Sequence, residues 1–311
     1  MLRTRDIRRR FDRAAREFDD ADFVHAATRE GIVSRLAPVL VEVASILDLG
    51  SATGAMGRLL GKRFRRARTV SLDLSHAMLT RARRQKPWLA KAAFVQAQAD
   101  RLPFADASFD LVVANQLLPW IPQPETLFGD VARVLRKGGC FAFATLGPDS
   151  LQELRGAWAA ADASFGDVGA SFGAEAPPTG SPPTGSPPTG SPPVAHVHSF
   201  ADMHDIGDGL VRAGLCDPVL DVDRLSLRYA STGSLFDDLT RAGARNALAG
   251  RSCALTGRAR FRAMVDALEN ATAGRGLSLE LELIYGHCWG GGPAHDPGVV
   301  RVAANRIPLR R

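Results

Sequence analysis

The segment from Ile46 to Gly54 constrains the fold of this chain more than any other. It reads Ile-Leu-Asp-Leu-Gly-Ser-Ala-Thr-Gly, an apolar run that ends in an acid and a glycine-rich turn. A short apolar run bounded by turn residues predicts a buried strand, and glycine lets the backbone turn sharply into a following helix. A strand, a turn and a helix in this order are typical of a nucleotide-cofactor site.

The chain after Pro38 continues this pattern, because strand-like and helix-like segments alternate as far as residue 146. We expect strands at residues 44–48, 69–73, 93–96, 111–115 and 140–146. We expect helices at residues 56–64, 76–84 and 124–135, the last of them stopped by Gly138 and Gly139. Strands that alternate with helices predict an α/β fold with a doubly wound, Rossmann-like sheet that is mostly parallel.

Regular structure is also expected at both ends of the chain. Apolar residues at helical spacing predict helices at residues 4–19, 23–36 and 201–213, with two more between 234 and 272. Strands are expected at residues 219–229 and 279–288. In the last strand Leu279, Leu281 and Leu283 alternate with Glu280 and Glu282, which predicts an antiparallel edge strand with one wet face.

The composition indicates a globular protein with a basic surface. The chain has 311 residues and a formal net charge of +6, so it can bury a sizeable core and attract acidic partners. Arginine gathers at residues 8–10, 62–68 and 81–84, although such runs also fit solvated helix faces. No apolar run is long enough to span a bilayer, and the charged N-terminal segment is unlike a signal peptide. We therefore expect a cytoplasmic protein with no membrane partner.

Two further features concern the loops and the thiols. Residues 177–193 contain the unit Pro-Pro-Thr-Gly-Ser three times, followed by a fourth Pro-Pro. Because this segment has no apolar side chain to bury, it predicts an inserted surface loop. The cysteines Cys140, Cys216, Cys253 and Cys288 are far apart in the sequence, so we expect reduced thiols rather than a zinc site or a disulfide framework.

The glycine-rich turn favours one class of cofactor. Asp48, Gly50 and Gly54 follow the spacing D-x-G-x-x-x-G, whereas a dinucleotide site needs a G-x-G-x-x-G turn that brings backbone amides to a pyrophosphate. S-Adenosylmethionine has no phosphate, so the looser turn suits it, and small residues let the backbone approach its amino acid and ribose. The middle glycine of the commonest version of this motif is Ala52 here.

Polar residues follow the later strands in the order that this cofactor requires. Asp73 ends the second strand, where its carboxylate can accept hydrogen bonds from both ribose hydroxyl groups. Alternatively, it is an acidic residue that stabilises the N-terminus of the following helix. Gln98 follows the third strand, and its side chain can accept a hydrogen bond from the amine of adenine. Asn115 ends the fourth strand, where we expect the methyl group of the cofactor. The expected cofactor residues are Asp48, Gly50, Ser51, Ala52, Gly54, Asp73, Leu74, Gln98, Ala99, Asp100, Asn115 and Gln116.

Other chemistries have less support. His196, His198 and His204 are close in sequence, but two of them border the proline-rich loop and no carboxylate spacing fixes a geometry, so we expect no metal site. The sequence has neither a P-loop nor a G-x-S-x-G turn. Residues 115–119 read Asn-Gln-Leu-Leu-Pro rather than the Asn-Pro-Pro-aromatic motif of amino-methylating nucleic-acid enzymes, so we expect no nucleic-acid partner.

Outside the proline-rich loop, the whole chain resembles the class I S-adenosylmethionine-dependent methyltransferases. Within them it is most similar to the malonyl-[acyl-carrier protein] O-methyltransferase family of biotin synthesis. The segments that carry this narrower resemblance are residues 10–15, 144–155, 202–208, 243–246, 255–258 and 285–289. The chain departs from the family pattern at three positions, with Ala52 in place of a glycine, Gln98 in place of the adenine-side acid and Phe18 in place of a tyrosine.

The resemblance implies an O-methyltransferase that uses S-adenosyl-L-methionine to esterify the free carboxylate of malonyl-acyl-carrier protein. A carboxylate is already ionised at neutral pH, so no catalytic base is implied, but a cation must hold it. The candidates for this cation are Arg251, Arg245, Arg155 and His204. Two other interpretations stay open, namely a methyltransferase for another small molecule such as a quinone precursor, and a protein-arginine hydroxylase or assembly factor on the same fold.

The same resemblance implies a division of the chain into functional parts. Residues 1–36 would form an N-terminal helical lid, and residues 37–160 the cofactor-binding core. The Pro/Gly/Ser/Thr-rich loop would occupy residues 161–198. Residues 199–311 would complete the sheet and carry an inserted helical lid at about 234–273.

Overall fold

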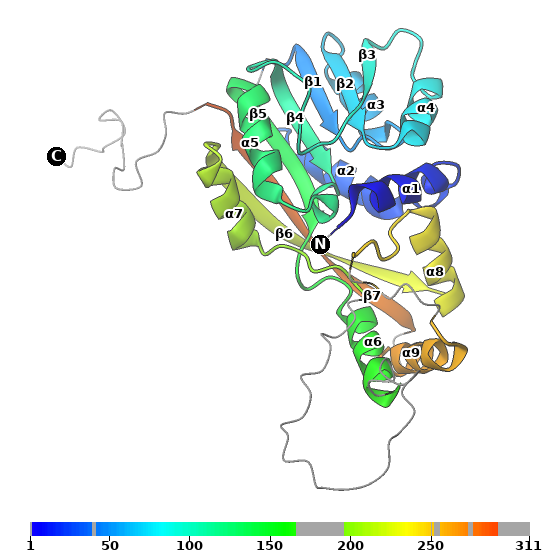
Figure 1. The fold of residues 1–311 in the computed structure, drawn as a ribbon. Helices are drawn as coiled ribbons and strands as arrows, with labels where there is room; N and C mark the ends of the chain where they lie inside the picture. Colours follow the sequence, from blue (N-terminus) through cyan, green and yellow to red (C-terminus); the bar gives the residue numbers. More distant parts are fainter. Residues whose placement is uncertain are drawn as a thin grey trace, which may run out of the picture.

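A seven-stranded sheet with the order β3-β2-β1-β4-β5-β7-β6 forms the framework of the computed structural model, and helices cover both of its faces (Figure 1). The structure describes residues 2–38, 42–165, 196–249, 251, 256–272 and 276–291. Strands β1 to β5 pair in parallel, and β7 runs antiparallel to both β5 and β6. The strand order reverses between β1 and β4, where doubly wound sheets open a crevice at the carboxyl ends of their strands.

The first half of the sheet follows the predicted alternation of strands and helices. Its strands are β1 (Ser45–Leu49), β2 (Arg68–Asp73), β3 (Ala92–Gln96), β4 (Phe109–Asn115) and β5 (Leu135–Leu146). Its helices are α3 (Ala55–Arg63), α4 (His76–Arg84), the short 3-10 helix η2 (Leu118–Trp120) and α5 (Pro124–Val134). The prediction of a doubly wound, mostly parallel sheet is therefore confirmed.

The end of α5 differs from the prediction. We expected Gly138 and Gly139 to stop this helix, but it ends at Val134, and Leu135 already has the extended backbone of β5. The carbonyl oxygen of Val134 accepts a hydrogen bond from the amide of Ser108 at 2.8 Å, and Leu135 pairs with Phe109. Pairing with the neighbouring strand therefore ends the helix before the glycines are reached.

The position of the last strand also differs from the prediction. We expected it at the edge of the sheet, but β7 (Leu277–Trp289) lies between β5 and the outermost strand β6 (Cys216–Tyr229). The alternation of leucine and glutamate has another cause, because residues 147–151 cover the glutamate face. There Glu282 accepts a hydrogen bond from the amide of Asp149 at 2.9 Å.

Two apolar layers hold the helices on the sheet. On one face, α5 and α7 (Met203–Arg212) pack through residues such as Leu127, Phe128 and Leu210. On the other face, α2 (Phe23–Arg35) and α3 pack through residues such as Ile32 and Leu60. Because both faces are covered, the central strands are buried throughout and the site can form only at a strand edge.

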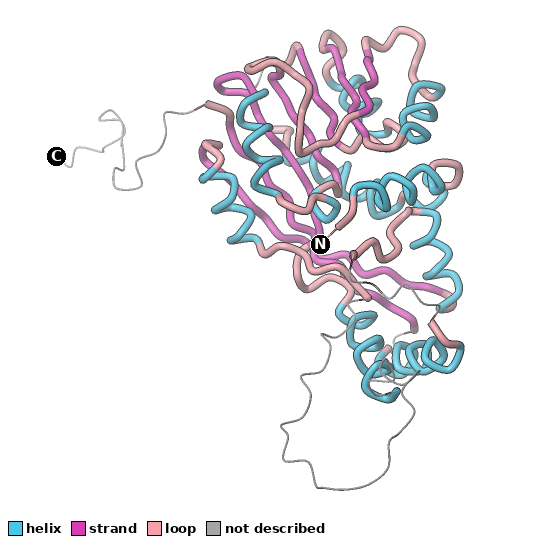
Figure 2. Tube along the Cα trace, viewed as in Figure 1, coloured by secondary structure: helices cyan, strands magenta, loops and turns pink. Residues whose placement is uncertain are grey.

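A third cluster extends the molecule beyond the central strands. The helices α6 (Gln152–Phe165), α8 (Thr232–Arg241) and α9 (Arg258–Ala271) lie around the far ends of β6 and β7, as Figure 2 shows in cyan and magenta. Leu154, Leu235, Met264 and Leu279 are buried among them. We did not anticipate α6, whereas both helices expected between residues 234 and 272 are present.

The N-terminal segment lies across the carboxyl edge of the sheet. We expected one helix at residues 4–19, but α1 (Thr4–Ala14) ends earlier and the 3-10 helix η1 (Phe18–Ala21) follows it. The break lets Phe18 turn inward, where it is buried with Ala14, Ala15 and Met78 of α4. The two short helices thereby bring the N-terminus over the crevice (Figure 1).

Several other predictions concern the remaining chain. Cys140, Cys216 and Cys288 are free thiols, whereas Cys253 lies outside the described residues. The repeated Pro-Pro-Thr-Gly-Ser segment also lies outside them. In the described part of the chain, no helix is long and apolar enough to cross a membrane.

Candidate functional site

A cavity lies at the carboxyl edge of the sheet, at the switch point between β1 and β4. Its volume is about 90 Å³, and residues of α1 and η2 form its outer wall. We call it the inner cavity. Most of the residues expected to hold the cofactor line it, namely Gly50, Ala52, Asp73, Leu74, Gln98, Ala99, Asp100, Asn115 and Gln116.

The other three expected cofactor residues lie elsewhere. Asp48 and Ser51 line a smaller cavity of about 20 Å³ that shares Gly50, Ala52 and other residues with the inner cavity. Gly54 lines none of the described cavities; it is the residue before α3 and has a φ of +80°. A Cβ atom on Gly54 would lie 3.0 Å from the Cβ of Ala82, so this glycine allows α3 and α4 to pack closely.

The turn after β1 has an unusual backbone that a glycine would adopt more easily. The φ angle is +65° at Gly50 and +45° at Ala52, which is the left-handed region that side chains disfavour. The amide of Ala52 donates to the Asp73 carboxylate at 2.8 Å, and the amide of Ser51 donates to the carbonyl of Leu72 at 3.0 Å. These bonds fix the turn to the end of β2 and explain why small residues occur there.

Asp73 is buried and lines the inner cavity. Burial raises the pKa of this carboxyl to about 6, although hydrogen bonds from the amides of Ser75 and Ala52 oppose the shift. At neutral pH the group is therefore mostly ionised and acts as an acceptor. A carboxylate has about four acceptor positions, so two backbone amides leave room for hydroxyl groups of a ligand.

Buried polar atoms without partners gather around these cavities. In the described part of the chain, five such side-chain atoms occur: His25 Nδ1, Asp48 Oδ2, Ser51 Oγ, Asn115 Oδ1 and Gln116 Nε2. Each belongs to a residue that lines the inner cavity or the small cavity beside it. Because an unpartnered buried polar atom is costly, such a cluster marks a ligand site. The mixture of donors and acceptors fits a ligand with amino-acid, ribose and adenine groups.

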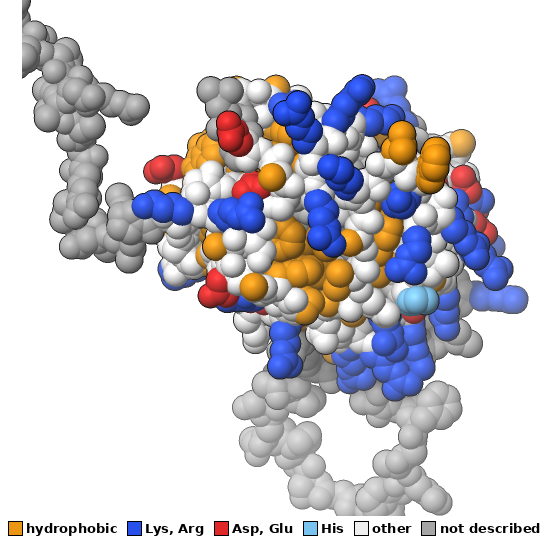
Figure 3. All heavy atoms as spheres, turned by 90° about the horizontal axis from the view of Figure 1, so that it is seen from above, with side chains coloured by type: hydrophobic (Ala, Val, Ile, Leu, Met, Phe, Trp, Pro, Cys, Tyr) orange, Lys and Arg blue, Asp and Glu red, His pale blue; other side chains and the backbone are white. Residues whose placement is uncertain are grey.

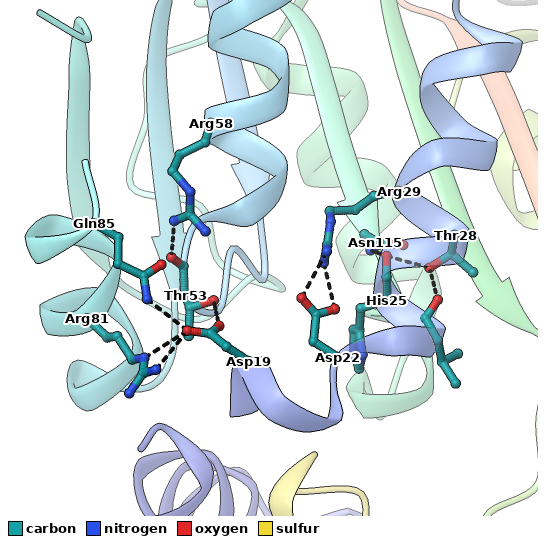
Figure 4. Close-up of polar contacts among 11 residues, drawn as sticks. Asp19, Asp22, His25, Thr28, Arg29, Thr53, Arg58, Arg81, Gln85 and Asn115 are labelled. Carbon is teal, nitrogen blue, oxygen red and sulfur yellow. Dashed lines mark hydrogen bonds and ion pairs between the residues drawn. The ribbon is translucent and has the colours of Figure 1, made fainter. Parts of the chain in front are cut away.

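A polar network holds the N-terminal segment over the cofactor turn (Figure 4). Asp19 of η1 accepts hydrogen bonds from Thr53 at 2.6 Å, Gln85 at 2.8 Å and Arg81 at 2.9 Å. Burial alone would raise the pKa of Asp19, but these hydrogen bonds hold it below its ordinary value. The carboxylate thus joins η1 to both the turn and α4.

His25 is fixed close by, at the start of α2. Its backbone carbonyl accepts a hydrogen bond from the side chain of Asn115 at 3.0 Å (Figure 4), and its ring meets Phe18 edge to face at 5.0 Å. Burial lowers the pKa of His25 to about 4, so its imidazole is neutral at physiological pH. A neutral imidazole offers one donor and one acceptor to whatever occupies the cavities.

A second, larger cavity adjoins the first. Its volume is about 500 Å³, and its walls are mainly apolar side chains of α1, α2, α6, α8 and α9 together with the ends of β6 and β7. We call it the outer cavity. Phe11, His25, Gln116 and Trp120 line both the inner and the outer cavity, so the two spaces meet at these residues, which we call the neck.

The four residues proposed as carboxylate partners occupy different places. Arg245 and Arg251 line the outer cavity. Arg155 donates instead to the backbone carbonyls of Pro148, Ser150 and His198 at 3.2–3.3 Å, outside the cavity wall. The side chain of His204 is 85% exposed and pairs with Asp202 at the start of α7, and His204 lines neither cavity. The geometry therefore favours Arg245 and Arg251.

Arg10 also lines the outer cavity, although it was not among the four expected carboxylate partners. Arg10 donates to the carbonyl of Asn246, and Arg251 pairs with Asp6 at 3.2 Å, so these contacts join α1 to residues 246–251. Burial lowers the pKa of Arg10, and the nearby charge of Arg251 lowers it further. Only the fold brings these arginines together; the sequence offered just the segment 10–15 as a family signal.

His196 and His198 take part in packing and hydrogen-bond contacts within the described chain. His196 stacks on Trp158 with ring centroids 3.9 Å apart, and His198 accepts from the amide of Ala247 at 3.2 Å. Among the described residues, no group of three or more histidine, cysteine, aspartate or glutamate side chains is placed to hold a metal ion.

Comparisons with known proteins agree with this architecture. The family described as Methyltransferase domain matches residues 47–143. A malonyl-[acyl-carrier protein] O-methyltransferase of Halorhodospira halophila is 36% identical, with 99% of this chain and 96% of that protein covered. The protein of the same name from Laribacter hongkongensis is 35% identical, with 91% and 88% covered.

Solved structures show a similar fold at low sequence identity. The YcgJ protein of Bacillus subtilis superposes with a TM-score of 0.55 and 15% identity, covering 86% of this chain and all of that one. At this identity the likeness concerns the fold alone.

Proposed function

The chain belongs to the malonyl-[acyl-carrier protein] O-methyltransferase family, and on this premise we propose that it converts the free carboxylate of malonyl-acyl-carrier protein to its methyl ester, an early step of biotin synthesis. The donor is S-adenosyl-L-methionine. One observation supports the location of this reaction: two cavities of very different size meet at a shared neck. A methyl transferase needs such an arrangement, because donor and acceptor must approach each other directly.

The inner cavity is the proposed site for S-adenosylmethionine. Asp73 is suited to the ribose hydroxyls, the turn at residues 50–52 to the amino acid, and Gln98 to Asp100 to the adenine. Gln98 lacks the charge of the acid that is usual in the family, but its carbonyl oxygen is still an acceptor. When bound, this cofactor supplies a methyl group activated by a sulfonium ion.

The chain itself contributes alignment and the exclusion of water. The substrate carboxylate is already ionised at neutral pH, so no side chain has to remove a proton. A correctly oriented pair of reactants can gain several orders of magnitude in rate, provided that the geometry is held. Phe11 and Trp120 line the neck, with ring centroids 5.0 Å apart, and their packing supports a dry passage between the cavities.

Arg245 and Arg251 are the proposed partners of the substrate carboxylate. Both line the outer cavity, and a guanidinium group attracts a carboxylate and can donate a charge-assisted hydrogen bond to it. Their segment lies beside the neck, because His198 bonds to Ala247 and meets the Trp120 ring edge to face at 5.2 Å. The malonyl group would therefore enter with its carboxylate near the neck and its thioester toward the outer cavity.

The elements that enclose the cavities are the proposed lids. Within the N-terminal part, residues 1–36, α1 and η1 would cover the inner cavity, while α2 packs on the sheet. The helices at about 234–273 would cover the outer cavity. The β-bridge between Leu2 and Leu248 and the ion pair between Arg251 and Asp6 join the two lids. The large carrier protein would dock on the outer surface of these lids. A role in biotin synthesis suits a cytoplasmic enzyme.

Genetic rescue tests this function in a cell. The gene for this chain, expressed in a biotin-requiring strain that lacks its own malonyl-carrier-protein methyltransferase, should restore growth without biotin. A matched variant with Asp73→Ala should fail to do so at equal protein level. Failure of the unaltered gene, with the protein present and folded, would contradict the proposed function.

A further inference from the structure

The neck contains two polar side chains whose role the reaction described so far does not explain. Phe11 and Trp120 form its aromatic part, whereas His25 and Gln116 line both cavities and each carries a buried polar atom that has no partner among the described residues. These two residues stand where the acceptor must meet the methyl group. Their chemistry therefore bears on the acceptor oxygen more directly than that of any arginine further out.

Gln116 has an unfavourable backbone conformation at the neck and an unpartnered side-chain donor. It follows β4, and its amide donates to the carbonyl of Ala144 at 2.8 Å. Its φ of +55° lies in the left-handed region, which glutamine seldom adopts. The residue is only 7% exposed, and its Nε2 has no hydrogen-bond partner among the described residues. A strained backbone and an unsatisfied donor at one residue are typical of a ligand-binding position.

His25 stands in the same neck and is also incompletely satisfied. Its Nδ1 is buried without a partner in the described chain. The hydrogen bond from Asn115 to its backbone fixes His25 next to the end of β4, and therefore close to Gln116 in the chain fold. The neck thus presents neutral polar groups instead of a charge.

We propose that Gln116 binds the acceptor rather than the cofactor: its side-chain amide donates a hydrogen bond to one oxygen of the malonyl carboxylate and leaves the other oxygen aimed at the methyl group. This inference rests on the proposed function. In the transfer, the free oxygen forms a bond to the methyl carbon while the bond from sulfur to carbon breaks and sulfur keeps the electron pair. No proton moves, so the amide acts by orientation alone.

A neutral donor suits this position better than an arginine. The carboxylate loses its negative charge as the ester forms, so a cation in contact with it stabilises the starting state more than the transition state. The amide of Gln116 loses less when the charge disappears. Arg245 and Arg251 can then attract the substrate from the wider cavity, while Gln116 sets the direction of the reacting group.

The test separates binding of the cofactor from reaction of the acceptor. Gln116→Leu has nearly the same size but no donor, so we expect kcat for malonyl-carrier-protein methylation to fall about 10- to 30-fold, the effect of one lost hydrogen bond. The Kd for S-adenosylhomocysteine, measured by calorimetry, should stay within about 3-fold, since the inference assigns this amide to the acceptor rather than to that ligand. Gln123→Leu, an exposed position before α5, is the matched control and should change neither value.

A second variant guards against a failure to fold. Gln116→Asn keeps the amide and tolerates a positive φ, but its donor is one carbon shorter, so kcat should fall by a smaller factor than in Gln116→Leu. Variants that bind S-adenosylhomocysteine normally but keep the wild-type kcat would overturn the inference. So would a loss of S-adenosylhomocysteine affinity that matches the loss of activity. If the wild-type protein itself does not methylate malonyl-carrier protein, the proposed function fails instead.

Discussion

Ala52 sets the shape of the cofactor turn at the cost of a strained backbone. Its φ of +45° would suit a glycine, yet its methyl group packs beside Ala14, Phe18 and Met78. An alanine in the left-handed region lowers the free energy of unfolding by about 1–2 kcal/mol. Burial of its methyl group and the smaller freedom of the unfolded chain raise this free energy by a similar amount. The departure from the family's glycine is therefore nearly neutral for stability.

This balance predicts effects of different size for two substitutions. Ala52→Gly should change the free energy of unfolding by less than about 1 kcal/mol, because relief of strain and loss of packing offset each other. Ala52→Val should lower it by about 2 kcal/mol or more, because a β-branched residue strongly disfavours a positive φ. Denaturant titration of both variants measures these differences. Equal destabilisation by glycine and valine would show that the backbone strain is unimportant.

Asp73 makes cofactor affinity depend on pH. Burial raises its pKa to about 6 in the free protein, and hydroxyl donors from a ligand favour the ionised form. Binding then releases a proton below this pKa, so affinity for S-adenosylhomocysteine should rise with pH up to about 6, by at most about 10-fold per unit. Asp48, whose pKa burial raises to about 7, lines the small cavity beside the turn at residues 50–52, where a cationic amino group of the ligand would favour its ionised form and extend the rise toward neutral pH.

The variant Asp73→Asn separates these contributions. It should weaken S-adenosylhomocysteine binding roughly 10- to 100-fold at pH 8, because hydrogen bonds to a charged group are lost. It should also flatten the pH dependence below about 6, leaving only the part that belongs to Asp48. Calorimetric titrations at several pH values measure both effects. An unchanged affinity and slope would remove Asp73 from the ribose site.

At the level of the elements, η1 depends on Asp19 for its position over the crevice. Asp19→Ala removes the bonds to Thr53, Gln85 and Arg81, so it should lower the free energy of unfolding by about 1–2 kcal/mol and weaken S-adenosylhomocysteine binding. Asp20→Ala, at the exposed neighbouring position, should cost less than about 0.5 kcal/mol. Similar losses in both variants, measured by denaturant unfolding, would argue against a specific anchor.

The sequence predicts local elements better than their neighbours in space. The alternation of apolar runs and helical periods was sufficient to identify β1 to β5, because each strand carries its own signal. The same alternation in β7 suggested an edge strand, and only the fold reveals that β6 lies outside it. The helix break after Ala14 is likewise a tertiary effect, since burial of Phe18 decides it.

The same distinction applies to the site. Motif spacing was sufficient to propose the residues of the inner cavity, because each follows directly after a strand of the parallel sheet. Arg10 and His25 lie before the first strand, and no local pattern connects them with the cavities. Arg155 and His204 were proposed from charge and resemblance alone, and their bonds lie outside the outer cavity.

Charge on the whole molecule extends beyond the site. Figure 3 shows Lys and Arg side chains spread over the face seen from above, with few acidic ones among them. The exposed residues Arg65 and Arg66 precede β2 and Arg68 begins it, so these arginines lie at the amino edge of the sheet, opposite the cavities. The exposed arginines of α1, by contrast, lie on an element that lines the outer cavity.

Docking of an acidic carrier protein should depend on the exposed arginines of α1 and not on those beside β2. Arg9→Glu combined with Arg13→Glu should raise KM for malonyl-carrier protein about 3- to 10-fold with little change in kcat, because the substrate has to approach past α1. The matched pair Arg65→Glu and Arg66→Glu should leave KM nearly unchanged. Steady-state kinetics at low and high salt provide the measurement, and equal effects of both pairs would contradict docking at the lid.

The most direct test of the whole account is methyl transfer in a purified system. S-Adenosylmethionine with a labelled methyl group is incubated with this protein and either malonyl-carrier protein or acetyl-carrier protein, which lacks the free carboxylate. The account predicts a labelled methyl ester on the malonyl form and no label on the acetyl form. No transfer to malonyl-carrier protein, together with active transfer to a quinone precursor, would contradict it.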